Sequence, residues 1–143
     1  MKMSKRKIFV SFDFENDRNY KYLLEAWNGN SEFDFEFDDK SAREINSWNI
    51  PTIKAALTRK INEADYTLVI VGKEANKLHK DRGLIGYKNW QNYEIAKSKE
   101  NGNKLIAIKL NSNYESPDEL LGAGASWAYS FKEDAIMRAV KNA

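Results

Sequence analysis

The stretch Tyr66-Thr67-Leu68-Val69-Ile70-Val71-Gly72 decides the fold of this chain. Its apolar, β-branched residues occupy both odd and even positions, so the stretch has no polar face for solvent. A strand that is apolar on both faces is typical of the centre of a parallel sheet, because helices cover such a sheet on each side. We therefore predict a central parallel strand over 66–71.

Outward from this strand, short apolar runs alternate with segments of helical periodicity. Further strands are predicted at 7–12, 33–37, 104–110 and 126–131, and the strict alternation in 33–37 is typical of a sheet edge. Helices are predicted at 20–27, 51–61, 90–100 and 133–143, with a polar turn at 13–18 before the first of them. Strands separated by helices imply right-handed crossovers. The prediction is an α/β, flavodoxin-like three-layer sandwich with a five-stranded parallel sheet in the order 2-1-3-4-5, formed by a single domain over 1–143.

Composition excludes several classes of protein. Lys and Arg number 23 against 21 Asp and Glu, which is too balanced for an obligate nucleic-acid-binding protein. Cysteine is absent, which excludes disulfides and thiolate chemistry and fits a reducing compartment. The apolar runs fall far short of the roughly 20 residues that a membrane-spanning helix needs. We expect a cytoplasmic protein with neither a nucleic-acid nor a membrane partner.

Polar and aromatic side chains gather where the predicted strands end. Ligands of such sheets bind beyond the carboxyl ends of the strands, at the switch between the first and third. Trp90 and Glu94 are four residues apart on the predicted helix 90–100, so they share a face. The residues expected at this edge are Phe12, Asp13, Phe14, Asn16 and Asp17 after the first strand, Asp39 and Ser41 after the second, Gly72 after the third, and Trp90, Tyr93 and Glu94.

Several known uses of this architecture do not fit. No glycine follows the first strand, as a GxxxxGK[ST] phosphate loop would require, and no aspartate ends strand 66–71, as a phospho-receiver would require. His79 is the only histidine; it lies in a lysine-rich loop and is expected on the solvated surface, which argues against a Ser-His-Asp hydrolase. Asp13, Asp17 and Asp39 form a conceivable cation site, but without a histidine or a defined ligand spacing we predict no metal.

Five segments, in order along most of the chain, resemble the TIR-like family, which includes short bacterial and archaeal proteins and the NAD-consuming TIR component of Thoeris antiphage systems. The opening strand and loop, 7–17, resemble [KR]-[IV]-F-[IV]-S-F-x-x-x-x-D, and Asp39-Lys40-Ser41 resembles the family's Asp-x-Ser. Leu68 to Gly72 is similar to the third-strand signature. Residues 90–98, beginning Trp90-Gln91-Asn92-Tyr93-Glu94-Ile95, resemble W-x-x-[YW]-E-I, and 101–108 resemble the segment that follows.

The resemblance implies a chemistry for Glu94, which takes the place of the glutamate on which NAD cleavage depends in catalytic TIR domains. Breaking the nicotinamide–ribose bond develops oxocarbenium charge on the sugar, and a fixed anion beside the ribose stabilises that charge, grips a hydroxyl or traps the sugar. Phe12 and Trp90 would stack on a ring of the substrate. The other substrate-binding residues expected are Asp13, Phe14, Asp39, Ser41 and Gly72. NAD is then a substrate, and neither a cofactor nor a metal is expected.

The resemblance also implies a product and partners. Water as acceptor gives ADP-ribose, and internal attack gives a cyclic nucleotide that would activate a separate effector protein in antiphage immunity. TIR catalysis commonly depends on self-association, so assembly of several copies is expected. The loop 38–49 would take part, although it lacks the proline often found there.

Two other functions stay open at this stage. The domain would also suit a non-catalytic interaction module, or a nucleoside deoxyribosyltransferase-like enzyme that uses a glutamate on N-glycosidic bonds. The same residues have structural explanations: Glu94 as a helix-surface acid, Trp90 as an anchor of its helix on the sheet and Asp13 as a helix cap. Asp39 and Ser41 would equally stabilise a turn.

Overall fold

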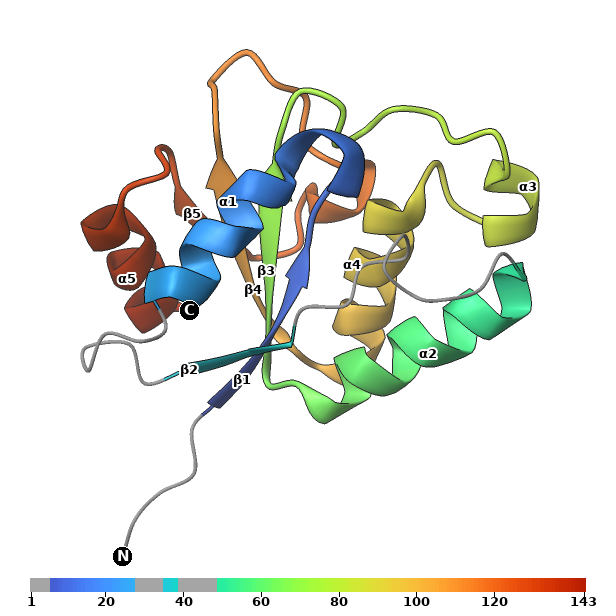
Figure 1. Ribbon diagram of the computed structural model, residues 1–143, viewed down its shortest axis with the longest axis horizontal. Helices are drawn as coiled ribbons and strands as arrows, with labels where there is room; N and C mark the ends of the chain where they lie inside the picture. Colours follow the sequence, from blue (N-terminus) through green and yellow to red (C-terminus); the bar gives the residue numbers. More distant parts are fainter. Residues whose placement is uncertain (1–5, 28–34, 39–48) are drawn as a thin grey trace, which may run out of the picture.

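A five-stranded parallel sheet forms the centre of the computed structural model, which describes residues 6–27, 35–38 and 49–143 (Figure 1). The strand order is β2-β1-β3-β4-β5, which matches the order expected from the sequence. All neighbouring strands pair in parallel, and β3 is buried at every residue. The predicted α/β class with a parallel sheet is therefore confirmed. The strands are β1 (Arg6–Ser11), β2 (Phe35–Asp38), β3 (Tyr66–Val71), β4 (Lys104–Lys109) and β5 (Ser126–Ala128).

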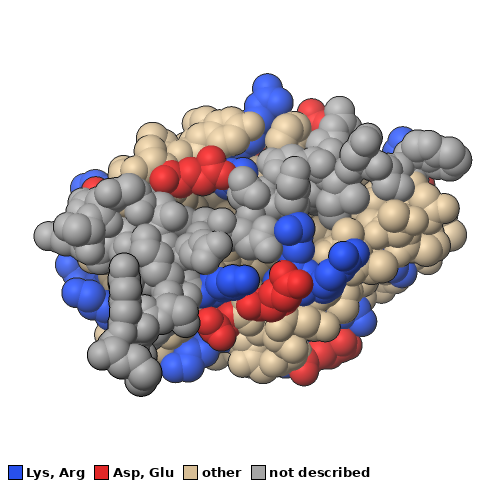
Figure 2. Space-filling view, turned by 60° about the horizontal axis from the view of Figure 1, so that its bottom comes forward, with Lys and Arg blue, Asp and Glu red and all other residues tan. Residues whose placement is uncertain are grey.

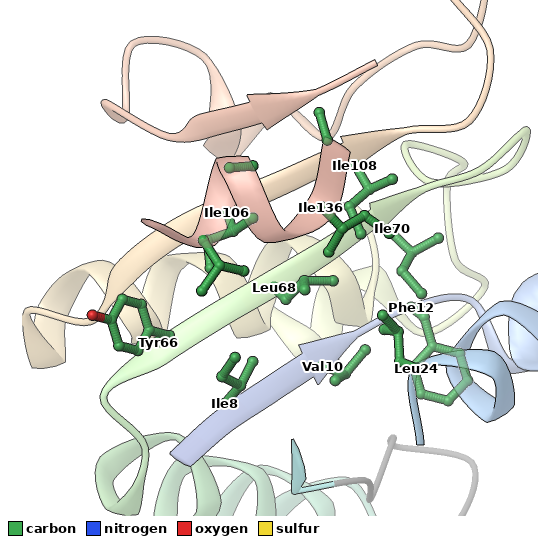
Figure 3. Packing of buried hydrophobic residues seen from close by; sticks show 13 residues of the cluster. Ile8, Val10, Phe12, Leu24, Tyr66, Leu68, Ile70, Ile106, Ile108 and Ile136 are labelled. Atoms are coloured by element: carbon green, nitrogen blue, oxygen red, sulfur yellow. The ribbon is translucent and has the colours of Figure 1, made fainter. Parts of the chain in front are cut away.

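Helices cover both faces of this sheet, so the domain has three layers (Figure 1). On one face, α1 (Phe14–Trp27) and α5 (Glu133–Asn142) pack against inward-pointing side chains of β1, β3 and β4, including Val10 and Ile70 (Figure 3). On the other face, α2 (Ile50–Glu63) and α4 (Trp90–Asn101) pack against the alternate residues, such as Phe9 and Val69. This alternation is the period of two that a strand imposes on its side chains. The short helix α3 (Arg82–Ile85) and the 3-10 turn η1 (Asp118–Leu120) lie in the connections.

The boundaries of α2 and α4 follow from capping residues in the sequence. The Asn49 side chain accepts a hydrogen bond from the backbone N–H of Thr52 at 3.1 Å and so caps α2. The Asn89 side chain caps α4 in the same way, at 2.9 Å from the N–H of Asn92. Gly102 ends α4 in the left-handed conformation, with φ of 76°, which a residue without Cβ adopts at little cost.

The first helix departs from the prediction, because it begins at Phe14 and the segment 13–18 is not a free polar turn. The carboxylate of Asp13 accepts hydrogen bonds from the backbone N–H of Glu15 at 3.1 Å and from the Asn16 amide at 2.6 Å. These bonds satisfy donors of the first turn and start the helix early.

The described part of the surface carries mixed charge on the face shown in Figure 2, where acidic and basic side chains lie interspersed. In the described ranges, no helix is long and apolar enough to cross a membrane.

Candidate functional site

Glu94 lies in the second turn of α4 and points toward the sheet rather than into bulk solvent. Its side chain is 2% exposed, and Ser11, the last residue of β1, donates a hydrogen bond from its hydroxyl to Glu94 Oε1 at 2.6 Å. Glu94 nevertheless lines a cleft of about 630 Å³ at the carboxyl ends of the strands. The acid therefore sits at the base of the cleft, with one edge against the end of β1.

Burial changes the charge of this acid. Desolvation raises the pKa of Glu94 to about 8, and the hydrogen bond from Ser11 opposes the rise without cancelling it. The side chain is thus mostly protonated at neutral pH when the cleft holds no ligand. The expectation of a fixed anion at position 94 therefore does not describe the empty cleft, because the sequence does not reveal how much water the surrounding fold removes.

Gln91 fixes the position of the Ser11–Glu94 pair. Its side-chain amide donates to the backbone carbonyl of Ile70 at 3.0 Å and to that of Ser11 at 3.3 Å. One buried side chain thereby ties the first turn of α4 to the ends of β1 and β3. Sequence analysis missed the roles of Gln91 and Ser11, although both lie in the quoted motifs. Helical spacing did indicate a role for Gln91, because it lies three residues before Glu94 and therefore on the same helix face, which meets the sheet.

A second amide network holds the start of α4 from the other side. Asn92 donates to the side-chain oxygens of Asn76 and Asn89, both at 3.0 Å, and its own oxygen accepts from the backbone N–H of Glu119. Asn89 also donates to the backbone carbonyls of Ala75 and Lys77 at 2.9 Å. Buried amides with satisfied partners hold a single geometry, so α4, the loop after β3 and η1 form a rigid support for the cleft.

Aromatic side chains form two walls of the cleft. Phe12 and Phe14 line it on the β1 side, with ring centroids 6.4 Å apart, and Trp90 lines it on the α4 side. Phe12 is only 4% exposed and belongs mainly to the core, whereas Phe14 and Trp90 are half-buried and present part of their rings to the cleft. Trp90 also packs edge-on against Tyr93 at 5.6 Å. Trp90 is therefore both an anchor of its helix and a cleft residue.

Asp13 also has two roles: its carboxylate caps α1, and the residue lines the cleft. Asp17 does not line the cleft: it is 5% exposed and its carboxylate lies against Gly72. A Cβ at position 72 would overlap Asp17 Oδ2, so the glycine makes room for that carboxylate. Gly72, expected to bind substrate, is likewise absent from the described residues that line the cleft.

His79 is not a freely solvated surface residue, as the sequence analysis expected. It lines the cleft, and its Nδ1 accepts a hydrogen bond from the backbone N–H of Asp81 at 3.0 Å. Its own backbone N–H donates to the backbone carbonyl of Lys88 at 2.7 Å, which ties the lysine-rich loop to the residues just before α4. Lys77 and Lys80 of the same loop also line it.

Two of the expected residues, Asp39 and Ser41, lie outside the described part of the chain. The cation site built from Asp13, Asp17 and Asp39 is therefore described only in part. Among the residues that the structure describes, no group of three or more His, Cys, Asp or Glu side chains is placed to hold a metal ion.

Comparison with known families gives a match over residues 9–115 to the model described as "Thoeris protein ThsB, TIR-like domain". The chain belongs to this family. The match contains every described residue that lines the cleft, whereas β5 and α5 lie beyond it. The TIR-like resemblance drawn from the sequence is therefore confirmed.

Solved structures and curated proteins add little to this assignment. The chain is similar to the TIR domains in the structure of the activated Roq1 resistosome directly recognizing the pathogen effector XopQ, with 18% identity over 73% of this chain and a TM-score of 0.47. The chain spans 57% of the length of that solved chain. No curated protein matches the sequence. The TIR-like assignment thus depends on the family model and on the motifs of the chain itself.

Proposed function

We propose that this TIR-like domain cleaves the nicotinamide–ribose bond of NAD, as an NAD glycohydrolase or ADP-ribosyl cyclase, with Glu94 as its catalytic residue. The single observation that carries the proposal is the placement of Glu94: a buried carboxyl, held by Ser11, at the base of a cleft beyond the carboxyl ends of the strands. Perturbed carboxyl groups in clefts are typical of functional sites.

The chemistry follows from the charges that change during cleavage. When the C1′–N1 bond breaks, its electron pair leaves with the ring, so nicotinamide departs neutral and positive charge passes to the ribose. The carboxylate form of Glu94 stabilises this oxocarbenium charge in a site from which most water is excluded. Water then attacks C1′ and loses its proton to the carboxylate, which gives ADP-ribose. Attack by another atom of the same nucleotide gives a cyclic product instead.

The aromatic and polar walls give the substrate an orientation. Phe14 and Trp90 offer partly exposed rings for stacking on a base, and Phe12 closes the wall behind them. Asp13 also lines the cleft, and we propose that its carboxylate accepts hydrogen bonds from ribose hydroxyls. The cleft volume of about 630 Å³ lies within the range of small-molecule sites.

Nicotinamide release from NAD tests the proposal. Wild-type protein should release nicotinamide at high protein concentration, and Glu94→Gln should not, because the amide keeps the shape and the Ser11 contact but cannot become an anion. Glu63→Gln is the matched control, since Glu63 is an exposed glutamate at the end of α2. Equal turnover by wild type and Glu94→Gln refutes the role of Glu94.

Nicotinamide release and a second assay, base exchange, separate the two competing functions. No turnover by either protein, at any concentration, indicates a non-catalytic interaction module. Base exchange between a deoxynucleoside and a free base, without cleavage of NAD, indicates a deoxyribosyltransferase-like enzyme. We further propose that the product activates a separate effector protein in antiphage immunity, and that copies of the domain self-associate for activity. The family match, to the TIR-like domain of a Thoeris protein, supports the first of these proposals. The second follows from the self-association that the TIR-like resemblance implies. Product identification by mass spectrometry and mass photometry of the active sample are the corresponding measurements.

A further inference from the structure

Among the described residues, Gln91 is the one buried amide whose oxygen has no protein partner. Five amide side chains are buried there, each 9% exposed or less: Asn76, Asn89, Gln91, Asn92 and Asn103. The side-chain oxygens of the four asparagines all accept hydrogen bonds from neighbouring donors. No described group donates to Gln91 Oε1, whose amide makes its hydrogen bonds through the nitrogen alone. Buried polar side chains are rarely left half satisfied, so this oxygen is an exception.

The orientation of the Gln91 amide is fixed by its partners. Gln91 Nε2 lies 3.0 Å from the carbonyl oxygen of Ile70 and 3.3 Å from that of Ser11. A carbonyl oxygen can only accept, so the atom between the two is the amide nitrogen, which donates one hydrogen to each. Turning the amide over would bring three oxygens together without a hydrogen between them. Gln91 Oε1 therefore stays at the opposite end of the amide and cannot exchange places with the nitrogen.

The free oxygen opens onto the cleft. Gln91 lines the cleft beside Glu94. Gln91 Oε1 is not among the described side-chain atoms that are sealed from solvent without a partner, so it retains contact with water. The residue as a whole is only 4% exposed, so this contact is a small opening at the base of the cleft. Since Gln91 and Glu94 are three residues apart on α4, their Cβ atoms are neighbours, roughly 5–6 Å apart.

We propose that Gln91 determines specificity in this cleft, because its oxygen accepts a hydrogen bond from a neutral O–H or N–H group of the ligand. That group lies next to the part of the ligand that contacts Glu94, and a sugar hydroxyl or a ring carboxamide has the required chemistry. The proposal rests on the proposed function, since it concerns the ligand that Glu94 meets.

The locked orientation is what makes Gln91 selective. A glutamine that is free to turn over offers a ligand either its nitrogen or its oxygen, whereas Gln91 offers only the acceptor. A ligand that fills the cleft displaces the water at Gln91 Oε1. If the ligand carries a methyl group or another acceptor at that point, the oxygen is left buried and unpaired, and binding weakens by roughly tenfold or more.

Carbon-13 NMR tests this contact directly. Gln91 is the only glutamine in the sequence, so protein made by cell-free synthesis with carbon-13 glutamine gives one side-chain carbonyl signal that needs no assignment. The signal moves downfield when the oxygen accepts a hydrogen bond. Two matched pairs of ligands differ only in donor groups, and the proposed reaction cleaves none of them. The first pair is nicotinamide and 3-acetylpyridine, which has a methyl group in place of the amide nitrogen. The second is carbocyclic NAD and its 2′,3′-dideoxy form.

The expected result is a downfield movement with the donor-bearing member of at least one pair and none with its partner. A response to nicotinamide assigns the donor to the carboxamide, and a response to carbocyclic NAD alone assigns it to a hydroxyl group. Equal movements within both pairs, or no movement with any of the four ligands, overturn the proposal. The experiment uses the wild-type protein, so it decides the question whether or not a variant of Gln91 folds.

Affinities of the same pairs provide a second measurement. Wild-type protein should bind the donor-bearing member of the responding pair roughly tenfold more tightly than its partner, and Gln91→Met, which lacks the oxygen, should bind both alike. Lys77→Met, in the same cleft wall, is the matched control and should keep the wild-type preference. A preference that Gln91→Met retains, or that Lys77→Met loses equally, contradicts the role of Gln91.

These results are independent of catalysis. A donor-specific response of Gln91 in a protein that leaves NAD intact retains the proposal for Gln91 and refutes the proposed function. Cleavage of NAD without any donor-specific response does the reverse.

Discussion

Replacing Glu94 by glutamine should make the protein more stable, and increasingly so as the pH rises. The reason is that the folded state keeps a proton on this buried acid, with a pKa of about 8, whereas the unfolded chain loses it near the ordinary value of 4.5. Between these two pH values the folded wild-type protein binds more protons than the unfolded chain, so its free energy of unfolding falls as pH rises. Glutamine carries no proton to lose and keeps an oxygen for the Ser11 hydroxyl.

The magnitude follows from the shift. Each pH unit between 4.5 and about 8 removes about 1.4 kcal/mol from wild-type stability, so the complete loss is at most roughly 5 kcal/mol. The stability contributed by the protonated acid is fully present below pH 4.5 and lost as the pH rises through about 8. The difference between variant and wild type should therefore be constant below pH 4.5, grow from there to about pH 8 and level off above it.

Urea unfolding, followed by tryptophan fluorescence at intervals from pH 4.5 to 9, measures this difference. Asp17, whose pKa is also raised, to about 6, is present in both proteins, so its contribution cancels. Glu63→Gln should follow wild type at every pH, because that carboxylate is exposed. A stability difference between Glu94→Gln and wild type that does not change between pH 5 and 8 would refute the burial of a protonated Glu94.

Three further predictions concern the supports of the site. Ser11→Ala removes the hydrogen bond that lowers the pKa of Glu94, so the pH midpoint of NAD cleavage, measured as kcat/KM, should move to higher pH, and an unchanged midpoint would contradict the contact. Gly72→Ala should destabilise the fold by about 1–3 kcal/mol, because the new methyl group overlaps Asp17. The double variant Gly72→Ala/Asp17→Ala should recover part of this loss. Purely additive changes in the free energy of unfolding would count against that contact. Gln91→Leu leaves two buried carbonyl groups without their donor and should cost about 1–3 kcal/mol in urea unfolding, whereas a neutral result would show that water or another side chain replaces the amide.

Local sequence patterns located the elements that build the cleft. The run 66–71 was predicted as a strand and is β3 over the same residues, because apolar residues on both faces leave a strand no stable place except a covered sheet. Trp90 and Glu94 share a helix face and both line the cleft, as their spacing predicted. In contrast, the polar segment 13–18 was misjudged, since the Asp13 side chain starts the helix there.

Local sequence patterns did not predict the contacts between segments that are far apart in the chain. The Ser11 hydroxyl meets Glu94 across 83 positions of sequence, and Gln91 meets Ser11 across 80. Gly72 was expected at the substrate, but its lack of a side chain serves Asp17 of a different element. His79 was placed on the surface by its lysine-rich neighbours, and backbone hydrogen bonds of its loop turn it toward the cleft. Helical spacing places Gln91 on the same face as Glu94, but it does not show which distant residues that face meets.

The amino-acid order alone determined the alternation of strands and helices, the parallel sheet and the edge at which the polar residues gather, because periodicity and capping act over a few neighbouring residues. Only the tertiary structure decided the charge of Glu94, because that depends on how completely segments far apart in the chain exclude water from one carboxyl group.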